Sequence, residues 1–293
     1  MAASDANLFV GIGTQIPYNK LIPLPDCAMT SEQISQTFRN ARLQAVPLAA
    51  YPAAQVPASL AEAYAIQQMS IDAWDDHVVG WKVAAIAPQW RDGYPAERVA
   101  GPVFSRTLVQ ATAGVAELPI IRGGYAAVEA EFALLLGADF PRDTCFASTE
   151  QLQRHVAAVH AAVELAGSPL PNLSALGPGA VISDFGNNTG LLIGPALPDF
   201  FTRAPADWQV ESRLNGNVAG TGSAERIPGG VLAALRFLAN SLVERGAILQ
   251  PGDWISTGAS TGIHPVQVGD TVEVTFDGMA PLALRIVQAQ AQV

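Results

Sequence analysis

Two glutamates stand two residues apart in an otherwise apolar run, VEAEFALLL, at Glu129 and Glu131. In a β-strand, residues i and i+2 point to the same face, so the two carboxylates would project side by side. Ala133 and Leu135 continue that face, where two unpaired anions would repel each other and resist burial. A divalent cation would resolve this conflict, and oxygen ligands suit Mg²⁺ or Mn²⁺ better than zinc. The alternative is a strand rim with both carboxylates in water.

Lys82 is the second residue that could do chemistry. The chain has only two lysines, Lys20 and Lys82, and otherwise uses arginine for its permanently positive side chains. Lys82 lies in GWKVAAI, a predicted strand. A lysine changes its pKa readily when it loses water, whereas an arginine keeps its proton, so Lys82 is a candidate for proton transfer. The alternative is a strand-end lysine whose ammonium reaches water.

Three further segments carry polar groups suited to a ligand. Glu164 ends an apolar stretch that we expect to be helical, where a solvated helix end is the alternative. Asp184, Asn187 and Asn188 lie in DFGNNTG, whose glycines allow the backbone to approach a ligand closely, although a plain turn has the same composition. The segment 256–262, STGASTG, offers amides and hydroxyls to a carboxylate.

Several other kinds of site are absent from the sequence. The four histidines show no metal-ligand spacing, and we expect them to be surface or hydrogen-bonded core residues. No GxSxG motif is present, which disfavours a serine hydrolase of that type. No GxGxxG motif follows a strand, which disfavours a nicotinamide cofactor.

Net charge and hydropathy limit the classes of partner that we expect. The chain has 293 residues and a formal net charge of −10, which argues against a nucleic-acid partner. No run approaches the roughly 20 apolar residues of a membrane-spanning helix, so we expect no membrane partner. The two cysteines, Cys27 and Cys145, form no CxxC motif, and the first basic residue is Lys20. These features predict a cytoplasmic protein.

The pattern of elements predicts an α+β fold. We expect helices after Thr30 and Ser59, each with a capping-box residue three positions later, and further helices over 148–163 and 230–245. Residues 88–102 are rich in turn formers. Strands are expected at 78–86, 128–136, 180–194, 252–257, 267–276 and 281–290, with a hairpin at Asn215-Gly216. We therefore predict an N-terminal arm and helical region over 1–77 and a β-rich catalytic domain over 78–293.

Together these segments resemble the 2-keto-4-pentenoate hydratase branch of the fumarylacetoacetate hydrolase superfamily, which also contains 4-oxalocrotonate decarboxylases. The resemblance runs from about residue 60 to the C-terminus. Six motifs carry it in order: GWKV (80–83), AGPVF (100–104), VEAEFALLL (128–136), AAVELAGS (161–168), DFGNNTGLLIG (184–194) and GDWISTG (252–258).

The resemblance implies a mixed β-roll and a homo-oligomer. It also implies that Glu129, Glu131 and Glu164 hold Mg²⁺ or Mn²⁺, and that Lys82 moves protons. Asp184 is implied as a second catalytic residue. By the same resemblance, the substrate is bound by the residues Asn187, Asn188, Thr257 and Gly258.

The activity implied is a hydratase that adds water to a 2-hydroxy-2,4-dienoate through a metal-bound enolate, giving a 4-hydroxy-2-oxo acid. The substrate partner would be a small 2-oxo acid. Decarboxylation of a vinylogous 2-oxo acid is the alternative, with acylpyruvate-type hydrolysis below it because no His–Glu helix is apparent. A non-catalytic partner subunit is a further alternative, which the intact glutamates and lysine weigh against. Three segments, RIPGGVLAAL, DGYPAERVAGP and STGIHP, depart from the hydratase pattern and leave the substrate open.

Overall fold

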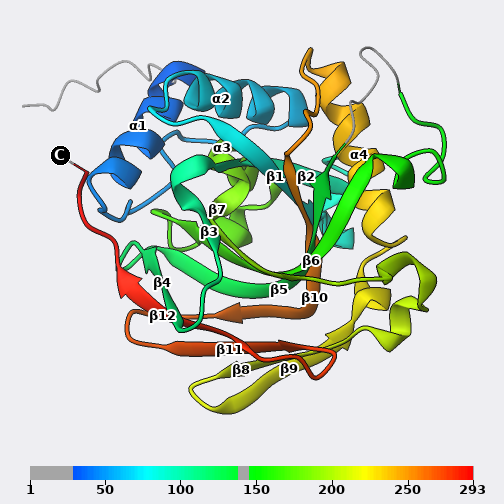
Figure 1. Cartoon of the computed structure of the whole chain (residues 1–293). Helices are drawn as coiled ribbons and strands as arrows, with labels where there is room; N and C mark the ends of the chain where they lie inside the picture. Colours follow the sequence, from blue (N-terminus) through cyan, green and yellow to red (C-terminus); the bar gives the residue numbers. More distant parts are fainter. Residues whose placement is uncertain (1–28, 138–144, 293) are drawn as a thin grey trace, which may run out of the picture.

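The computed structural model describes residues 29–137 and 145–292, which fold into two mixed β-sheets and four α-helices (Figure 1). The helices are α1 (Ser31–Leu43), α2 (Leu60–Asp72), α3 (Pro178–Ser183) and α4 (Val231–Glu244). The strands are β1 (Val78–Ala85), β2 (Arg98–Phe104), β3 (Leu108–Gln110), β4 (Val115–Ile120), β5 (Tyr125–Leu136), β6 (Val156–Ser168), β7 (Asn188–Ala196), β8 (Gln209–Leu214), β9 (Asn217–Ser223), β10 (Trp254–Pro265), β11 (Thr271–Phe276) and β12 (Leu282–Gln288).

The larger sheet has seven strands in the order β2-β1-β10-β5-β6-β7-β3, and the smaller has five in the order β4-β12-β11-β8-β9. The pairs β1–β10, β3–β7 and β4–β12 are parallel, and the other pairs are antiparallel. Figure 1 shows the five-stranded sheet on one side of the curved larger sheet and α1, α2 and α3 on the other. The predicted α+β class is confirmed.

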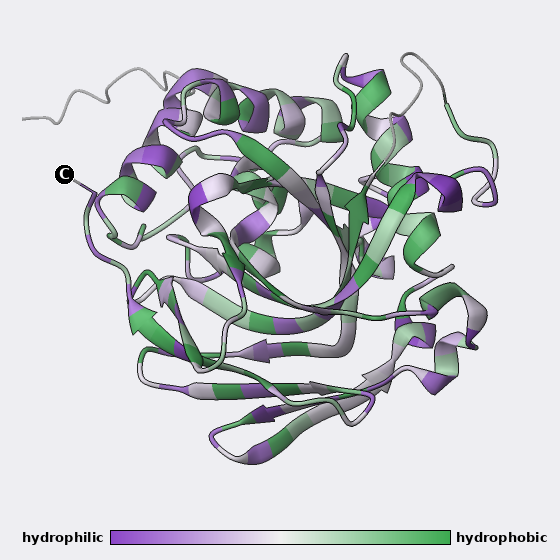
Figure 2. Ribbon diagram, viewed as in Figure 1, coloured by the Kyte–Doolittle hydropathy of each residue, from purple (hydrophilic) through white to green (hydrophobic). Residues whose placement is uncertain are grey.

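The two faces of β5 serve different purposes. Its even-numbered residues, such as Val128, Phe132 and Leu134, are buried in the main core with residues of the five-stranded sheet and α4. Because side chains alternate along a strand, Glu129 and Glu131 point the opposite way. Figure 2 shows short hydrophilic stretches on strands that are otherwise white to green. The main core thus fixes the strand that carries the glutamates.

The N-terminal helices begin where the sequence predicts. Thr30 and Gln33 form a complete capping box at α1, and the Ser59 hydroxyl accepts from the Glu62 backbone N–H at α2. Buried residues Phe38 and Ile66 pack α1 and α2 onto the α3 segment. The helical layer is therefore anchored to the sheet through residues that follow β6.

The helix predicted over 148–163 is wrong. Residues 156–168 form β6, which pairs with β5 on one side and β7 on the other. A strand buried on both faces shows a continuous apolar run rather than alternation, so spacing alone does not distinguish it from a helix. Glu164 consequently lies within a strand rather than at a helix end.

Two other predictions need correction. The strand expected over 180–194 begins only at Asn188, because residues 178–187 form α3 and a short 3-10 helix, Phe185–Asn187. The turn-rich region over 88–102 ends in the buried strand β2, which includes the AGPVF motif. Gly101 explains this motif, since a Cβ there would collide with the Phe185 carbonyl.

Other sequence-based predictions have mixed outcomes. The hairpin at Asn215-Gly216 joins β8 to β9, and α4 ends before Gly246, as expected. The arm is predicted over residues 1–29, of which 1–28 lie outside the described residues. The division at residue 77 into two domains stays a prediction. Within the described part of the chain, no helix combines the length and hydropathy needed to cross a bilayer.

Candidate metal centre

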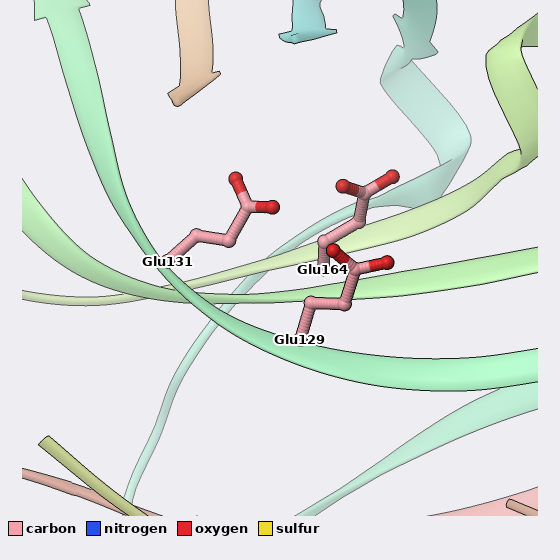
Figure 3. Close-up of side chains that lie close together, drawn as sticks. All are labelled: Glu129, Glu131 and Glu164. Carbon is pink, nitrogen blue, oxygen red and sulfur yellow. The ribbon is translucent and has the colours of Figure 1, made fainter. Parts of the chain in front are cut away.

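Three glutamates that are far apart in the sequence meet on one face of the larger sheet. Glu129 of β5 lies opposite Glu164 of β6 in the strand register, and Glu131 lies two residues along on the same face as Glu129. One carboxylate oxygen from each lies within 4.8 Å of the others. Figure 3 shows the three side chains directed to the same side of these strands.

Lys82 of β1 completes this cluster. Its Nζ lies 3.3 Å from Glu164 Oε1 and donates a hydrogen bond to Asn187 Oδ1 at 2.8 Å. Lys82 is 2% exposed. The three glutamates are buried as well, since Glu129, Glu131 and Glu164 are 5%, 1% and 0% exposed. The alternatives of a solvated strand rim and a lysine reaching water are therefore wrong.

A bulge in β10 holds Glu131. The register between β10 and β5 shifts between Ser256 and Ala259, where β10 advances three residues while β5 advances two, so β10 carries one extra residue. The Ser256 hydroxyl donates to Glu131 Oε2, and the Gly258 backbone N–H donates to the same oxygen at 2.8 Å. Gly258 has φ +116°, a conformation that side chains rarely adopt. The STG motif thus orients one carboxylate of the cluster.

The predicted substrate-binding residues have different surroundings. Asn188 Nδ2 donates to Glu164 Oε1 at 3.1 Å, so both asparagines of DFGNNTG contact the cluster. The Thr257 hydroxyl instead donates to the Phe132 carbonyl at 2.6 Å and is buried. Thr257 of β10 is thus hydrogen-bonded to the backbone of β5. Its contact with substrate stays a prediction.

Asp184, the second predicted catalytic residue, is bound to an arginine. Its Oδ1 lies 2.6 Å from Nε of Arg42, a residue of α1 that sequence reasoning missed. Its Oδ2 is buried with no hydrogen-bond partner among the described residues. An arginine on an amphipathic helix resembles any surface arginine, so the sequence gives no signal for this contact across 142 positions.

Burial changes the ionisation of the cluster. Burial, with the Glu164 charge second, raises the pKa of Glu129 to about 7, and burial likewise raises the pKa of Glu131 well above its usual value. Burial alone would lower the pKa of Lys82, but Glu164 and the other two carboxylates outweigh it and raise that pKa. The folded chain therefore resists three ionised carboxylates unless positive charge is added.

A divalent cation fits this arrangement. Three ionised carboxylates and one ammonium leave two uncompensated negative charges in a buried place. Glu164 Oε2 is buried and has no hydrogen-bond partner among the described residues, so it is free to bind a cation. A set of oxygen ligands alone suits hard cations such as Mg²⁺ and Mn²⁺.

A surface groove with a volume of about 900 Å³ lies elsewhere, between α2 and α4. Its lining mixes apolar side chains with charged ones, Arg98, Arg236 and Glu244 among them, and includes none of the three clustered glutamates. Chemistry rather than size identifies the candidate site, because three buried carboxylates, two of them with raised pKa values, meet there beside a buried lysine.

Comparisons with known proteins agree with this geometry. The profile described as fumarylacetoacetate (FAA) hydrolase C-terminal matches residues 79–287. A 4-oxalocrotonate decarboxylase from a Pseudomonas species is 27% identical over 108 residues, which are 37% of this chain. That match spans only 41% of the relative's own length.

Solved structures show the same fold. A 4-oxalocrotonate decarboxylase from Pseudomonas putida, complexed with magnesium and adipate, matches with a TM-score of 0.72 and 20% identity, covering 88% of this chain and 97% of that one. Fumarylpyruvate hydrolase from Pseudomonas aeruginosa, with Mn²⁺ and pyruvate, matches with a TM-score of 0.52 and 18% identity, covering 75% and 94%. Since the family profile extends from β1 to β12, the resemblance seen in the sequence is confirmed: this chain belongs to the fumarylacetoacetate hydrolase family.

Proposed function

We propose that the protein is a metal-dependent decarboxylase of a short 2-oxo acid in which a carbon–carbon double bond is conjugated to the keto group, as in 4-oxalocrotonate. The observation that carries the proposal is the buried cluster of Glu129, Glu131 and Glu164 beside Lys82. These three glutamates would hold Mg²⁺ or Mn²⁺, the ions bound in two structures of similar fold.

A divalent cation held by these glutamates would supply a Lewis acid that stabilises negative charge at the C2 oxygen of a 2-oxo acid. The protein contributes a largely water-free surrounding, in which such electrostatic effects are stronger than in water. Ser256 and the Gly258 N–H fix one oxygen of Glu131, so its other oxygen remains free to act as a ligand.

Lys82 is the proton donor to the substrate in this proposal. During decarboxylation, the bond to the leaving carboxyl group breaks, and its electron pair moves through the conjugated system toward the C2 oxygen. Carbon dioxide leaves, and one proton must be added at the C2 oxygen to convert the dienolate into the 2-hydroxydienoate. The Lys82 ammonium, held by Asn187 Oδ1 and Glu164 Oε1, is the acidic group that could supply it.

Relatives favour decarboxylation over the hydration expected from the sequence. One 4-oxalocrotonate decarboxylase matches 37% of this chain in sequence, and another has a similar fold over 88% of it. Hydrolysis finds less support, because ring nitrogens of His160 and His264 are already hydrogen-bonded to Gly194 O and the Thr261 hydroxyl. The homo-oligomer and the cytoplasmic location stay predictions.

One assay separates the possible activities. Metal-stripped protein is supplied with Mg²⁺ and 2-oxohex-3-enedioate, and separately with 2-hydroxypenta-2,4-dienoate, while released CO₂ and loss of dienol absorbance are followed. Our proposal requires CO₂ from the first substrate. Loss of the dienol without CO₂ would establish the hydratase instead, and turnover unaffected by EDTA would exclude the metal centre.

A further inference from the structure

Arg42 connects the N-terminal helical layer to the candidate metal centre. It lies in the last turn of α1, outside residues 79–287 that the family profile matches. Its side chain is only 10% exposed. A buried arginine on a helix outside the matched region needs a role that the family profile does not supply.

One guanidinium group holds both ends of the DFGNNTG segment. Nε donates to Asp184 Oδ1 at 2.6 Å, and the ring of Phe185 lies 5.3 Å from the guanidinium carbon. The remaining donors reach further acceptors: Asn188 O at 3.1 Å, Thr189 Oγ1 at 3.4 Å, Gly167 O at 2.9 Å and Asp184 O at 3.4 Å. Arg42 therefore ties this segment to β6, three residues beyond Glu164.

The segment that Arg42 holds is strained. Phe185, Gly186 and Asn187 have φ values of 54°, 64° and 58°, and two of them are not glycine. Such conformations persist only where the surrounding structure imposes them. Asn187 is the last residue of this strained run, and its side chain accepts the hydrogen bond from Lys82.

The same segment touches a metal-ligand candidate. Asn188, whose carbonyl accepts from Arg42, donates its side-chain amide to Glu164 Oε1. Groups that hydrogen-bond to metal ligands orient them, and losing such a group typically costs about 10- to 100-fold in metal affinity. Arg42 thus stands one contact further out, with Asn188 between it and the ligand.

We propose that Arg42 is a positioning residue, which holds Asn188 against Glu164 and Asn187 against Lys82. The helical layer would then contribute a side chain that positions residues of the candidate metal centre, in addition to packing against the sheet. This inference rests on the proposed function for its kinetic consequences, but its effect on metal affinity can be measured without any substrate.

The sharpest variant is Arg42→Lys. A lysine keeps the positive charge beside buried Asp184, but its single nitrogen cannot reach all of the acceptors that the planar guanidinium reaches. We expect a folded protein whose Mn²⁺ affinity is about tenfold weaker. The matched control is Arg39→Lys, because Arg39 lies on the same helix and contacts only Ser35 Oγ and Ala73 O in the described structure.

A double-mutant cycle tests the route of the effect. Mn²⁺ affinity of the metal-stripped proteins is measured for the wild type, Arg42→Lys, Asn188→Ala and the double variant, with folding checked by circular dichroism. If Arg42 acts through Asn188, the double variant binds Mn²⁺ about as well as Asn188→Ala alone. Additive losses, or wild-type affinity in folded Arg42→Lys, would overturn the inference.

Kinetics supply a second measurement. We expect Arg42→Lys at saturating Mn²⁺ to lower kcat more than it raises KM, because the Asn187–Lys82 contact is also loosened. If the wild type turns over no 2-oxo acid yet Arg42→Lys still weakens Mn²⁺ binding through Asn188, the proposed function fails while the positioning role stands. An equal loss in Arg39→Lys would show a general effect of α1 and contradict the role.

Discussion

Charged side chains are used in opposite ways in the two sheets. On the five-stranded sheet, Glu211 of β8 pairs with Arg213 at 2.7 Å, and Asp277 after β11 pairs with Arg203 at 2.6 Å. These side chains are between 34% and 41% exposed, and each negative charge has one positive partner. On the seven-stranded sheet, three carboxylates share a single lysine and are almost completely buried.

The difference separates a balanced surface from a functional site. Exposed, paired charges contribute little to stability because water competes for them. Buried, unbalanced charges cost free energy in the protein alone, so a fold retains them only where something else compensates. The cluster is therefore best understood as a site built for a cation, at the expense of the stability of the metal-free chain.

The largest effect is expected for Glu131→Gln. The substitution keeps the size of the side chain but removes a charged ligand that Ser256 and Gly258 hold in place. We expect Mg²⁺-dependent turnover to fall by more than about 100-fold, since even outer-shell changes cost about 10- to 100-fold. Steady-state kinetics at several Mg²⁺ concentrations measure it, with Glu273→Gln on the exposed face of β11 as control. Normal turnover in Glu131→Gln would show that the buried carboxylates matter no more than the exposed ones.

Lys82→Met should separate binding from chemistry. The substitution removes the ammonium, the positive group that interacts with the three carboxylates. The affinity for Mn²⁺ should therefore remain the same or increase. Proton transfer by a positioned group typically contributes about 10²- to 10⁴-fold, and kcat should fall by that order. Titration calorimetry and initial rates test the two halves. Weakened metal binding with unchanged kcat would assign Lys82 a purely structural role.

The pH dependence of the metal-free protein tests the cost of the cluster. The pKa of Glu129 is about 7 when folded, above its usual value of 4.5. A raised pKa in the folded state favours folding below about pH 4.5, and this contribution, on the order of 3 kcal/mol, is lost as pH rises through 7. Metal-free Glu129→Gln should therefore unfold at a higher temperature than wild type at pH 8 and at nearly the same temperature at pH 4.5.

Thermal scans with and without Mn²⁺ provide the control for this experiment. Added metal should stabilise the wild type most at pH 8, where Glu129 must otherwise carry a buried charge. It should not stabilise Glu129→Gln to the same extent. If the wild type and Glu129→Gln differ equally at both pH values, ionisation of Glu129 is not the source of the difference.

The smallest effect is expected at the surface pairs. Asp277→Asn removes one charge of the Arg203 pair, and asparagine accepts the left-handed conformation that Asp277 adopts at φ 46°. We expect the unfolding midpoint to move by no more than about 2 °C and activity to remain unchanged. A shift as large as that of the buried substitutions would remove the contrast between the two sheets.

Much of the site could be predicted because its chemistry is local. The period of two in Glu129-Ala130-Glu131 places two carboxylates on one face of a strand, and the structure has them there. The capping residues Thr30 and Ser59 likewise marked two helix starts, because caps satisfy backbone donors within four residues.

The rest depends on pairing between distant segments. The sequence predicts a helix that ends at Glu164, because AAVHAAVELA is mostly apolar and shows no alternation, and only its position between β5 and β7 makes it a strand. The role of Arg42 is set by contacts across more than 100 residues. No local pattern records such contacts, which is why sequence reasoning found the three glutamates but missed Arg42.

Anomalous diffraction from crystals soaked in Mn²⁺ tests the central claim most directly. We predict one strong manganese peak per chain, about 2.1 Å from oxygens of Glu129, Glu131 and Glu164, and no such peak in Glu131→Gln. A peak at another place, or none at these carboxylates at millimolar Mn²⁺, would contradict the account.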